Sequence, residues 1–123
     1  MKIEGTEIEI NGIKYAPKGS ESKQAYDNKQ REYVVVRGDR SGVFAGYLDS
    51  KNGSEVVLVN VRRLWYWDGA ASCSQLAEKG VSKPENCKFP MAVKKILVLD
   101  AIEILYATEE ARKSLEGVWI WQA

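Results

Sequence analysis

The fold is decided by EYVVVRGDRSGVFAGYLDSKNGSEVVLVNVRR, the stretch from Glu32 to Arg63. It contains three runs of β-branched and aromatic residues, which are typical of strands. Glycine-containing turns at 38–42 and 51–53 separate the runs, and short turns join antiparallel neighbours. The stretch therefore predicts an antiparallel meander with strands at 32–37, 43–49 and 55–61. We expect the third strand to continue through Arg62 and Arg63 as far as Trp67.

The residues after the meander predict two short helices and three further strands. Ser72 and Gln75 have the spacing of a capping box before a helix near 73–79, and Gly80 can end that helix. Pro84 can begin one further turn. Thr108 is a suitable N-cap for a helix through Glu116. The remaining apolar runs predict strands at 92–98, 101–106 and 118–121.

The N-terminal quarter of the chain has a different character. The dipeptide Asn11-Gly12 favours a two-residue hairpin turn within Thr6 to Tyr15. The residues from Pro17 to Arg31 are polar and show no periodicity, which indicates a linker. We therefore expect an N-terminal hairpin and polar linker over residues 1–31, followed by a strand-rich core domain over 32–123.

The sum of these elements predicts an α+β fold that is mostly β. Short, twisted strands close together in sequence tend to curl, so we expect a small antiparallel, partly closed barrel of the SH3-like or Sm-like kind, with two short helices. The span from Gly42 to Arg63, with Gly46-Tyr47-Leu48-Asp49 inside it, resembles the Sm-like pattern.

The composition argues for binding rather than catalysis. The 123 residues contain no histidine and two cysteines. The missing histidine removes the commonest general base and the commonest metal ligand. Cys73 and Cys87 alone cannot complete a zinc site. We therefore expect no enzyme activity, no metal and no cofactor.

Charge and hydropathy bear on the partners and the location. The formal net charge is +1, which gives no global attraction to nucleic acid or to an anionic membrane. Locally, the segment from Asn60 to Lys95 has seven basic residues against three acidic ones, so an anionic ligand is expected there. No apolar run is long enough to span a membrane, and residues 1–5 lack the apolar core of a secretion signal. These observations predict a cytoplasmic protein that does not bind membranes.

The densest chemical grouping is Asn60-Val61-Arg62-Arg63-Leu64-Trp65-Tyr66-Trp67. Arginine binds phosphate with a bidentate fork, and aromatic rings stack on bases. The alternative is that the tryptophans are core residues and the arginines are solvated or paired with acids. A second candidate is the loop from Ser82 to Phe89, which could equally be a surface turn capped by Asn86. The candidate ligand-binding residues are Arg62, Arg63, Trp65, Trp67, Asn86, Lys88 and Phe89.

Several stretches resemble a family of small phage-encoded proteins that usually have no assigned function. The stretches are Tyr33 to Arg37, Gly42 to Leu48, Arg62 to Ser72, and Lys83 to Phe89, which contains Pro-Glu-Asn-Cys-Lys-Phe. The resemblance implies no catalytic residues. Small non-catalytic phage proteins include the anti-Thoeris and anti-CBASS sponges, which sequester cyclic nucleotide immune signals.

Three functional hypotheses follow from the size, the missing catalytic groups and the arginine–aromatic cluster. The first is a homo-oligomeric protein that sequesters a cyclic or phosphorylated nucleotide and so blocks host anti-phage defence. Arg62, Arg63 and Lys88 would hold phosphates, aromatic rings would stack on the base, and Asn86 would read its edge. The second is a protein-binding inhibitor of a host enzyme, and the third is an Sm-like nucleic-acid-binding module.

Overall fold

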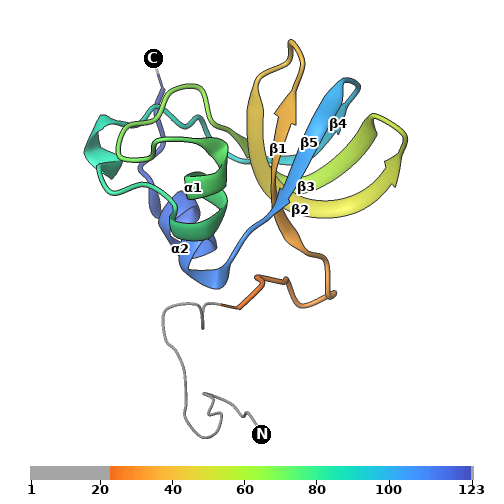
Figure 1. Cartoon of the computed structure of the whole chain (residues 1–123), viewed down its shortest axis with the longest axis horizontal. Coiled ribbons are helices and arrows are strands. Elements are labelled where there is room, and N and C mark those ends of the chain that lie inside the picture. The colour runs from red at the N-terminus through yellow and green to blue at the C-terminus, as the bar shows by residue number, and fades with distance from the viewer. Residues whose placement is uncertain (1–22, 123) are drawn as a thin grey trace, which may run out of the picture.

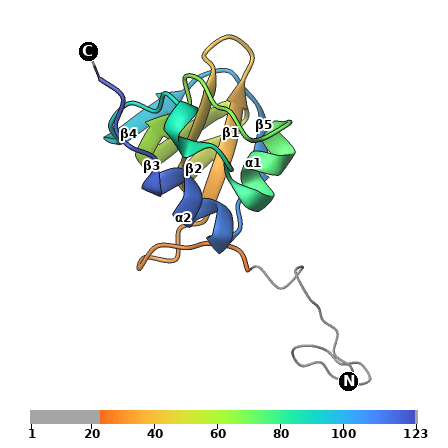
Figure 2. The ribbon, with the colours of Figure 1, turned by 90° about the vertical axis from the view of Figure 1, so that its left-hand side faces the viewer.

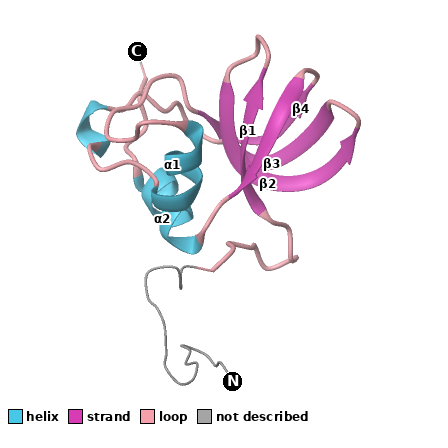
Figure 3. Ribbon diagram, in the orientation of Figure 1, coloured by secondary structure: helices cyan, strands magenta, loops and turns pink. Residues whose placement is uncertain are grey.

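The structure is a computed structural model that describes residues 23–122, and the hairpin expected over Thr6 to Tyr15 lies outside them. Five strands form one antiparallel sheet with the order β4-β3-β2-β1-β5. The sheet lies beside the helices (Figures 1 and 3). The strands are β1 (Tyr33–Gly38), β2 (Val43–Asn52), β3 (Glu55–Arg63), β4 (Val93–Val98) and β5 (Ala101–Tyr106). The predicted meander and the mostly-β fold class are confirmed.

The sheet is strongly curved but open. Its edges are β4, which pairs with β3, and β5, which pairs with β1. Only Leu99 and Asp100 separate these two edge strands in the sequence, yet within residues 23–122 they are not paired with each other. The sheet therefore curls as expected without closing into a barrel.

Two short helices cover one face of the sheet (Figures 1 and 2). They are α1 (Cys73–Lys79) and α2 (Glu109–Gly117), and a 3-10 turn, η2 (Pro84–Asn86), lies between α1 and β4. The predicted caps are confirmed: Ser72 Oγ accepts from the Gln75 N–H at 3.2 Å, and Thr108 Oγ1 accepts from the Ala111 N–H at 3.0 Å. Thr108 Oγ1 also donates to the carbonyl oxygen of Glu78 at 2.8 Å, which joins the two helices.

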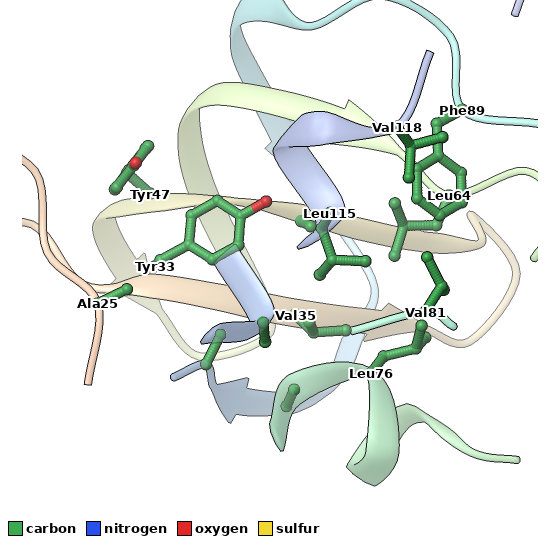
Figure 4. Packing of buried hydrophobic residues seen from close by; sticks show 14 of the residues in the cluster. Ala25, Tyr33, Val35, Tyr47, Leu64, Leu76, Val81, Phe89, Leu115 and Val118 are labelled. Atoms are coloured by element: carbon green, nitrogen blue, oxygen red, sulfur yellow. The ribbon is translucent and has the colours of Figure 1, made fainter. Parts of the chain in front are cut away.

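The alternation of side chains in β1 divides the core into two clusters. Tyr33 and Val35 pack toward the helices, together with Leu76 and Leu115 (Figure 4). Val34 and Val36 belong to the second cluster, on the opposite face of the strand. The other buried members of that second cluster are Phe44, Val56, Leu58, Val61 and Val98.

A bulge at Asn60 changes the face on which the following residues lie. Asn60 has φ of 47°, a left-handed conformation that asparagine tolerates better than most residues. In a regular strand, residues three positions apart point to opposite faces. Because of the bulge, Leu58 and Val61 lie in the same cluster. Arg62 consequently points to the helix-covered face, and Arg63 lies over Phe44 on the other face.

The segment from Lys23 to Arg31, expected to be a polar linker, packs against the domain. Ala25 is buried, its N–H donates to the Ala107 carbonyl oxygen at 3.0 Å, and its own carbonyl accepts from the Tyr33 N–H at 2.9 Å. The folded unit thus includes residues on both sides of position 32.

Two predicted strand regions are absent from the sheet. The third strand ends at Arg63 rather than Trp67, and beyond it only Tyr66 forms an isolated bridge, with Lys88. The predicted strand at 118–121 is an extended segment with one parallel bridge, between Ile120 and Phe89. Both segments lie past the sheet and are held by isolated backbone hydrogen bonds, between Tyr66 and Lys88 and between Trp121 and Phe89, rather than by a strand ladder.

Candidate functional site

Arg62 is a buried cation that binds backbone carbonyl groups. The residue is 6% exposed. Its five N–H groups point at five carbonyl oxygens, at donor–acceptor distances between 2.8 and 3.4 Å. The acceptors belong to Phe89, Pro90, Leu115, Val118 and Trp119. Burial lowers the pKa of the guanidinium, which nevertheless stays charged at neutral pH.

These hydrogen bonds give Arg62 a structural role. They join the end of β3 to the 89–90 segment, to the end of α2 and to the C-terminal segment. Phe89, whose ring lies 5.4 Å from the guanidinium carbon, is completely buried. Neither Arg62 nor Phe89 has a free surface for a phosphate or a base, so the ligand contacts proposed below do not include them.

Lys88 lies between two aromatic rings at the surface next to this anchor. Its Nζ is 6.0 Å from the ring centroid of Tyr66 and 5.7 Å from that of Trp121, which are distances of cation–π contact. Two backbone hydrogen bonds pair Tyr66 with Lys88, and the Trp121 N–H donates to the Phe89 carbonyl oxygen at 2.9 Å. No carboxylate among residues 23–122 lies within ion-pair distance of Lys88.

A hollow of about 530 Å³ continues this surface. It is lined by Trp121 together with Pro84, Glu85, Cys87, Trp119 and Ile120. Trp119 is 89% exposed and Trp121 is 44% exposed, values far above those of core tryptophans. We call Tyr66, Lys88, Trp119 and Trp121 the aromatic–lysine surface.

Arg63 and Trp67 of the arginine–aromatic cluster have contacts elsewhere in the fold. Arg63 Nη1 donates to the Ser41 carbonyl oxygen at 2.6 Å, and its guanidinium carbon lies 4.6 Å from the Phe44 ring centroid. Trp67 packs against the helix-side core. Trp65 is 64% exposed, so it remains accessible to a ligand.

The loop before Lys88 is held together by Asp68. Asn86 Nδ2 donates to Asp68 Oδ2 at 3.0 Å, so one side of the Asn86 amide already has a partner. The Cys87 thiol lies 3.6 Å from the Asp68 carbonyl oxygen. Burial raises the pKa of the Cys87 and Cys73 thiols, which disfavours a nucleophilic thiolate at either position.

Sequence reasoning missed three members of the aromatic–lysine surface. Tyr66 was part of the recognised cluster but was not selected as a ligand contact, and Trp119 and Trp121 were assigned to a strand. The available signal was the alternation Val118-Trp119-Ile120-Trp121, which puts the two indole rings on one side of an extended chain. Val118 occupies the opposite side and is buried.

Residues 23–122 contain no group of three or more cysteine or acidic side chains that could hold a metal ion. Within the same residues, no helix has the length and apolar character needed to cross a bilayer.

Comparison with known proteins identifies a family but gives no activity. No curated protein and no solved structure matches the chain. A family model matches residues 31–115, which cover the whole sheet and most of α2. The chain therefore belongs to the DUF6948 family, which is described as a domain of unknown function.

Proposed function

We propose that this chain is a binding protein for a phosphorylated nucleotide and that the aromatic–lysine surface is its binding site. The observation that carries the proposal is the Lys88 ammonium between the rings of Tyr66 and Trp121. A lysine without a paired carboxylate attracts phosphate, and exposed indole rings stack on bases of any sequence. The hollow beside Trp119 is large enough for a small ligand.

The roles divide between the side chains. Lys88 contacts a phosphate, Trp119 or Trp121 stacks on a base, and Trp65 is a further exposed ring on the same chain segment as Tyr66. Glu85, in the wall of the hollow, opposes an anion and so limits affinity. Arg62 holds the Phe89 and Trp119 backbone in place without touching the ligand.

In this proposal the ligand is bound and not transformed. The absence of histidine from the sequence leaves lysine, tyrosine and acidic groups as the candidates for proton transfer. Sequestration of a cyclic or phosphorylated nucleotide immune signal, as the resemblance to small phage proteins suggests, needs binding alone. The strand order and the two-residue link between β4 and β5 are compatible with an SH3-like or Sm-like architecture.

A second candidate function is inhibition of a host protein. Trp119 and Trp65 are 89% and 64% exposed, which leaves aromatic surface for contact with a protein partner. Exposed aromatic residues are also characteristic of the centres of protein interfaces.

Native mass spectrometry of the full chain purified from defence-competent cells distinguishes the two functions. A retained small molecule with the mass of a nucleotide supports the first function. A retained host protein at a fixed stoichiometry supports the second. Recovery of the nucleotide only as a cleaved product would contradict binding without turnover.

A further inference from the structure

A second hollow, of about 540 Å³, also borders the C-terminal segment that carries Trp119 and Trp121 of the aromatic–lysine surface. Volumes of roughly 300–1,000 Å³ are typical of sites for small molecules. Ile120 is the one residue that lines both hollows. The second hollow is lined by Asp27, Asn28, Tyr33, Tyr47, Asn60, Arg62, Ala92, Glu116, Val118 and Ile120.

The buried hydroxyl of Tyr33 has no hydrogen-bond partner among the described residues. Tyr33 is 1% exposed, and its ring makes an edge-to-face contact with the ring of Tyr47 at 5.0 Å between centroids. Burial, with a further effect from the Glu116 carboxylate, raises the pKa of Tyr33, so the hydroxyl keeps its proton. Buried hydroxyls in folded proteins nearly always have partners. Tyr33 lines the hollow, and its hydroxyl is the one buried polar side-chain group in residues 23–122 that lacks a partner.

The charged side chains around the hollow already have partners. Glu116 accepts from Tyr47 Oη at 3.1 Å and from Arg112 Nη1 at 2.6 Å. Asp27 accepts from Arg31 Nε at 2.7 Å. All five N–H groups of Arg62 point at carbonyl oxygens, as described above. Both carboxylates are thus paired with an arginine, and Arg62 has no N–H group left to donate to an anion.

The hydrogen-bonding groups that remain are uncharged. The amides of Asn28 and Asn60 are exposed and bond to no other residue in the described part of the chain. Together with the Tyr33 hydroxyl, the two amides provide neutral donors and acceptors.

The rest of the lining is apolar. Ala92, Val118 and Ile120 contribute aliphatic surface, and Tyr33 and Tyr47 contribute aromatic rings. We propose that this hollow binds a small uncharged molecule that carries a carboxamide or hydroxyl group on an apolar body. The polar group would bond to the Tyr33 hydroxyl, and the apolar body would pack against Val118 and Ile120.

Three probes of nearly equal shape test the charge preference: benzamide, benzoate and benzamidinium. Each is titrated into the ¹⁵N-labelled full chain and followed by NMR. Benzamide is expected to give saturable shifts at the amides of Tyr33, Asn60 and Val118, with binding at least several-fold tighter than either ion. Equal or tighter binding of an ion, or no saturable shift at these residues with any probe, would overturn the proposal.

Removal of the Tyr33 hydroxyl by substitution with phenylalanine provides the second test. Tyr33→Phe is expected to raise the melting temperature, because it removes an unpaired buried polar group, and to weaken benzamide binding about three- to tenfold. Lys88→Gln, outside this hollow, should leave benzamide binding unchanged. If Tyr33→Phe binds benzamide with wild-type affinity, the hydroxyl has no role in a ligand site. Because nucleotide binding is assigned to the other surface, Tyr33→Phe should not alter it.

Discussion

Arg62 Nη2 donates to the carbonyl oxygen of Phe89 at 2.8 Å, and the guanidinium carbon lies 5.4 Å from the centroid of the same residue's ring. The Arg62 side chain thus contacts both the backbone and the ring of Phe89, the residue that follows Lys88. We therefore infer that the position of Lys88 at the surface depends on the buried Arg62.

Arg62→Ala should destabilise the fold strongly. It leaves several buried carbonyl groups without donors, so we expect a loss of about 3 kcal/mol in the free energy of unfolding. Urea unfolding followed by circular dichroism measures the loss. Arg63→Ala is the matched control, and we expect it to cost less than about 1 kcal/mol, because Arg63 is half-exposed and makes one hydrogen bond within residues 23–122. Equal costs for both variants would contradict the structural role of Arg62.

Gly46→Ala should also be severely destabilising. A Cβ at Gly46 would lie 2.6 Å from Val61 Cβ and 2.8 Å from Val61 Cα, at the bulge next to Asn60. The backbone of β2 or β3 must move to relieve this clash, and we expect the free energy of unfolding to fall by about 1–3 kcal/mol or more. Gly117→Ala is the control, since nothing lies within 4 Å of a Cβ there. A Gly46→Ala protein with the wild-type melting temperature would show that the strands do not approach this closely.

Asp100 should make the stability depend on pH in acid. A hydrogen bond from Ser41 Oγ at 2.5 Å, with two more from the Arg40 and Ser41 N–H groups, lowers the pKa of Asp100. A carboxyl group with a lowered folded-state pKa stabilises the fold above its unfolded pKa of about 3.9, and this contribution disappears as the pH falls through the folded value.

Melting temperatures between pH 7 and pH 2.5 measure that dependence. Asp100→Asn should melt below the wild type at pH 7, and the difference should shrink as the pH falls below about 4. Asp39→Asn, in the β1–β2 turn whose Arg40 and Ser41 N–H groups bond to Asp100, is the control and should follow the wild-type curve. A constant difference between Asp100→Asn and wild type across the pH range would contradict the prediction.

The two sheet edges predict self-association. Both edge strands expose apolar side chains: Val93 and Leu97 on β4, and Ile102 and Tyr106 on β5. Unpaired edges of this kind tend to pair with other chains, so we expect a dimer or a larger closed ring. Light scattering at high protein concentration measures the mass, and a monomer there would refute the expectation.

The strands and helices could be predicted because local signals determine them. The β-branched runs around Val35 and Leu58 form strands, and the hydroxyl groups of Ser72 and Thr108 cap helices at the expected positions. The prediction of a strand at 118–121 was wrong. The Val118 and Trp119 carbonyl groups accept hydrogen bonds from the Arg62 side chain rather than from a neighbouring strand.

The candidate site could be predicted only in part. Strict alternation from Leu58 would place Arg62 on the Leu58 face, but the bulge at Asn60 turns it toward the helices. No sequence pattern reports such a bulge reliably, because asparagine is common in ordinary turns as well. Lys88 was selected for its charge alone, and its contacts with Tyr66 and Trp121 join residues distant in sequence.

The most direct test of the proposed function is calorimetric titration of the full chain with cyclic dinucleotides, nucleoside monophosphates and the matching nucleosides. The phosphorylated ligands should bind more tightly than the nucleosides, and Lys88→Gln should weaken their binding roughly ten- to hundredfold, the loss expected for a charge-assisted hydrogen bond. Glu85→Gln, which removes an opposing charge from the wall of the hollow beside Trp119 and Trp121, should bind at least as tightly as wild type. Wild-type affinity in Lys88→Gln, or equal binding of nucleosides and nucleotides, would contradict the assignment of the aromatic–lysine surface as a nucleotide site.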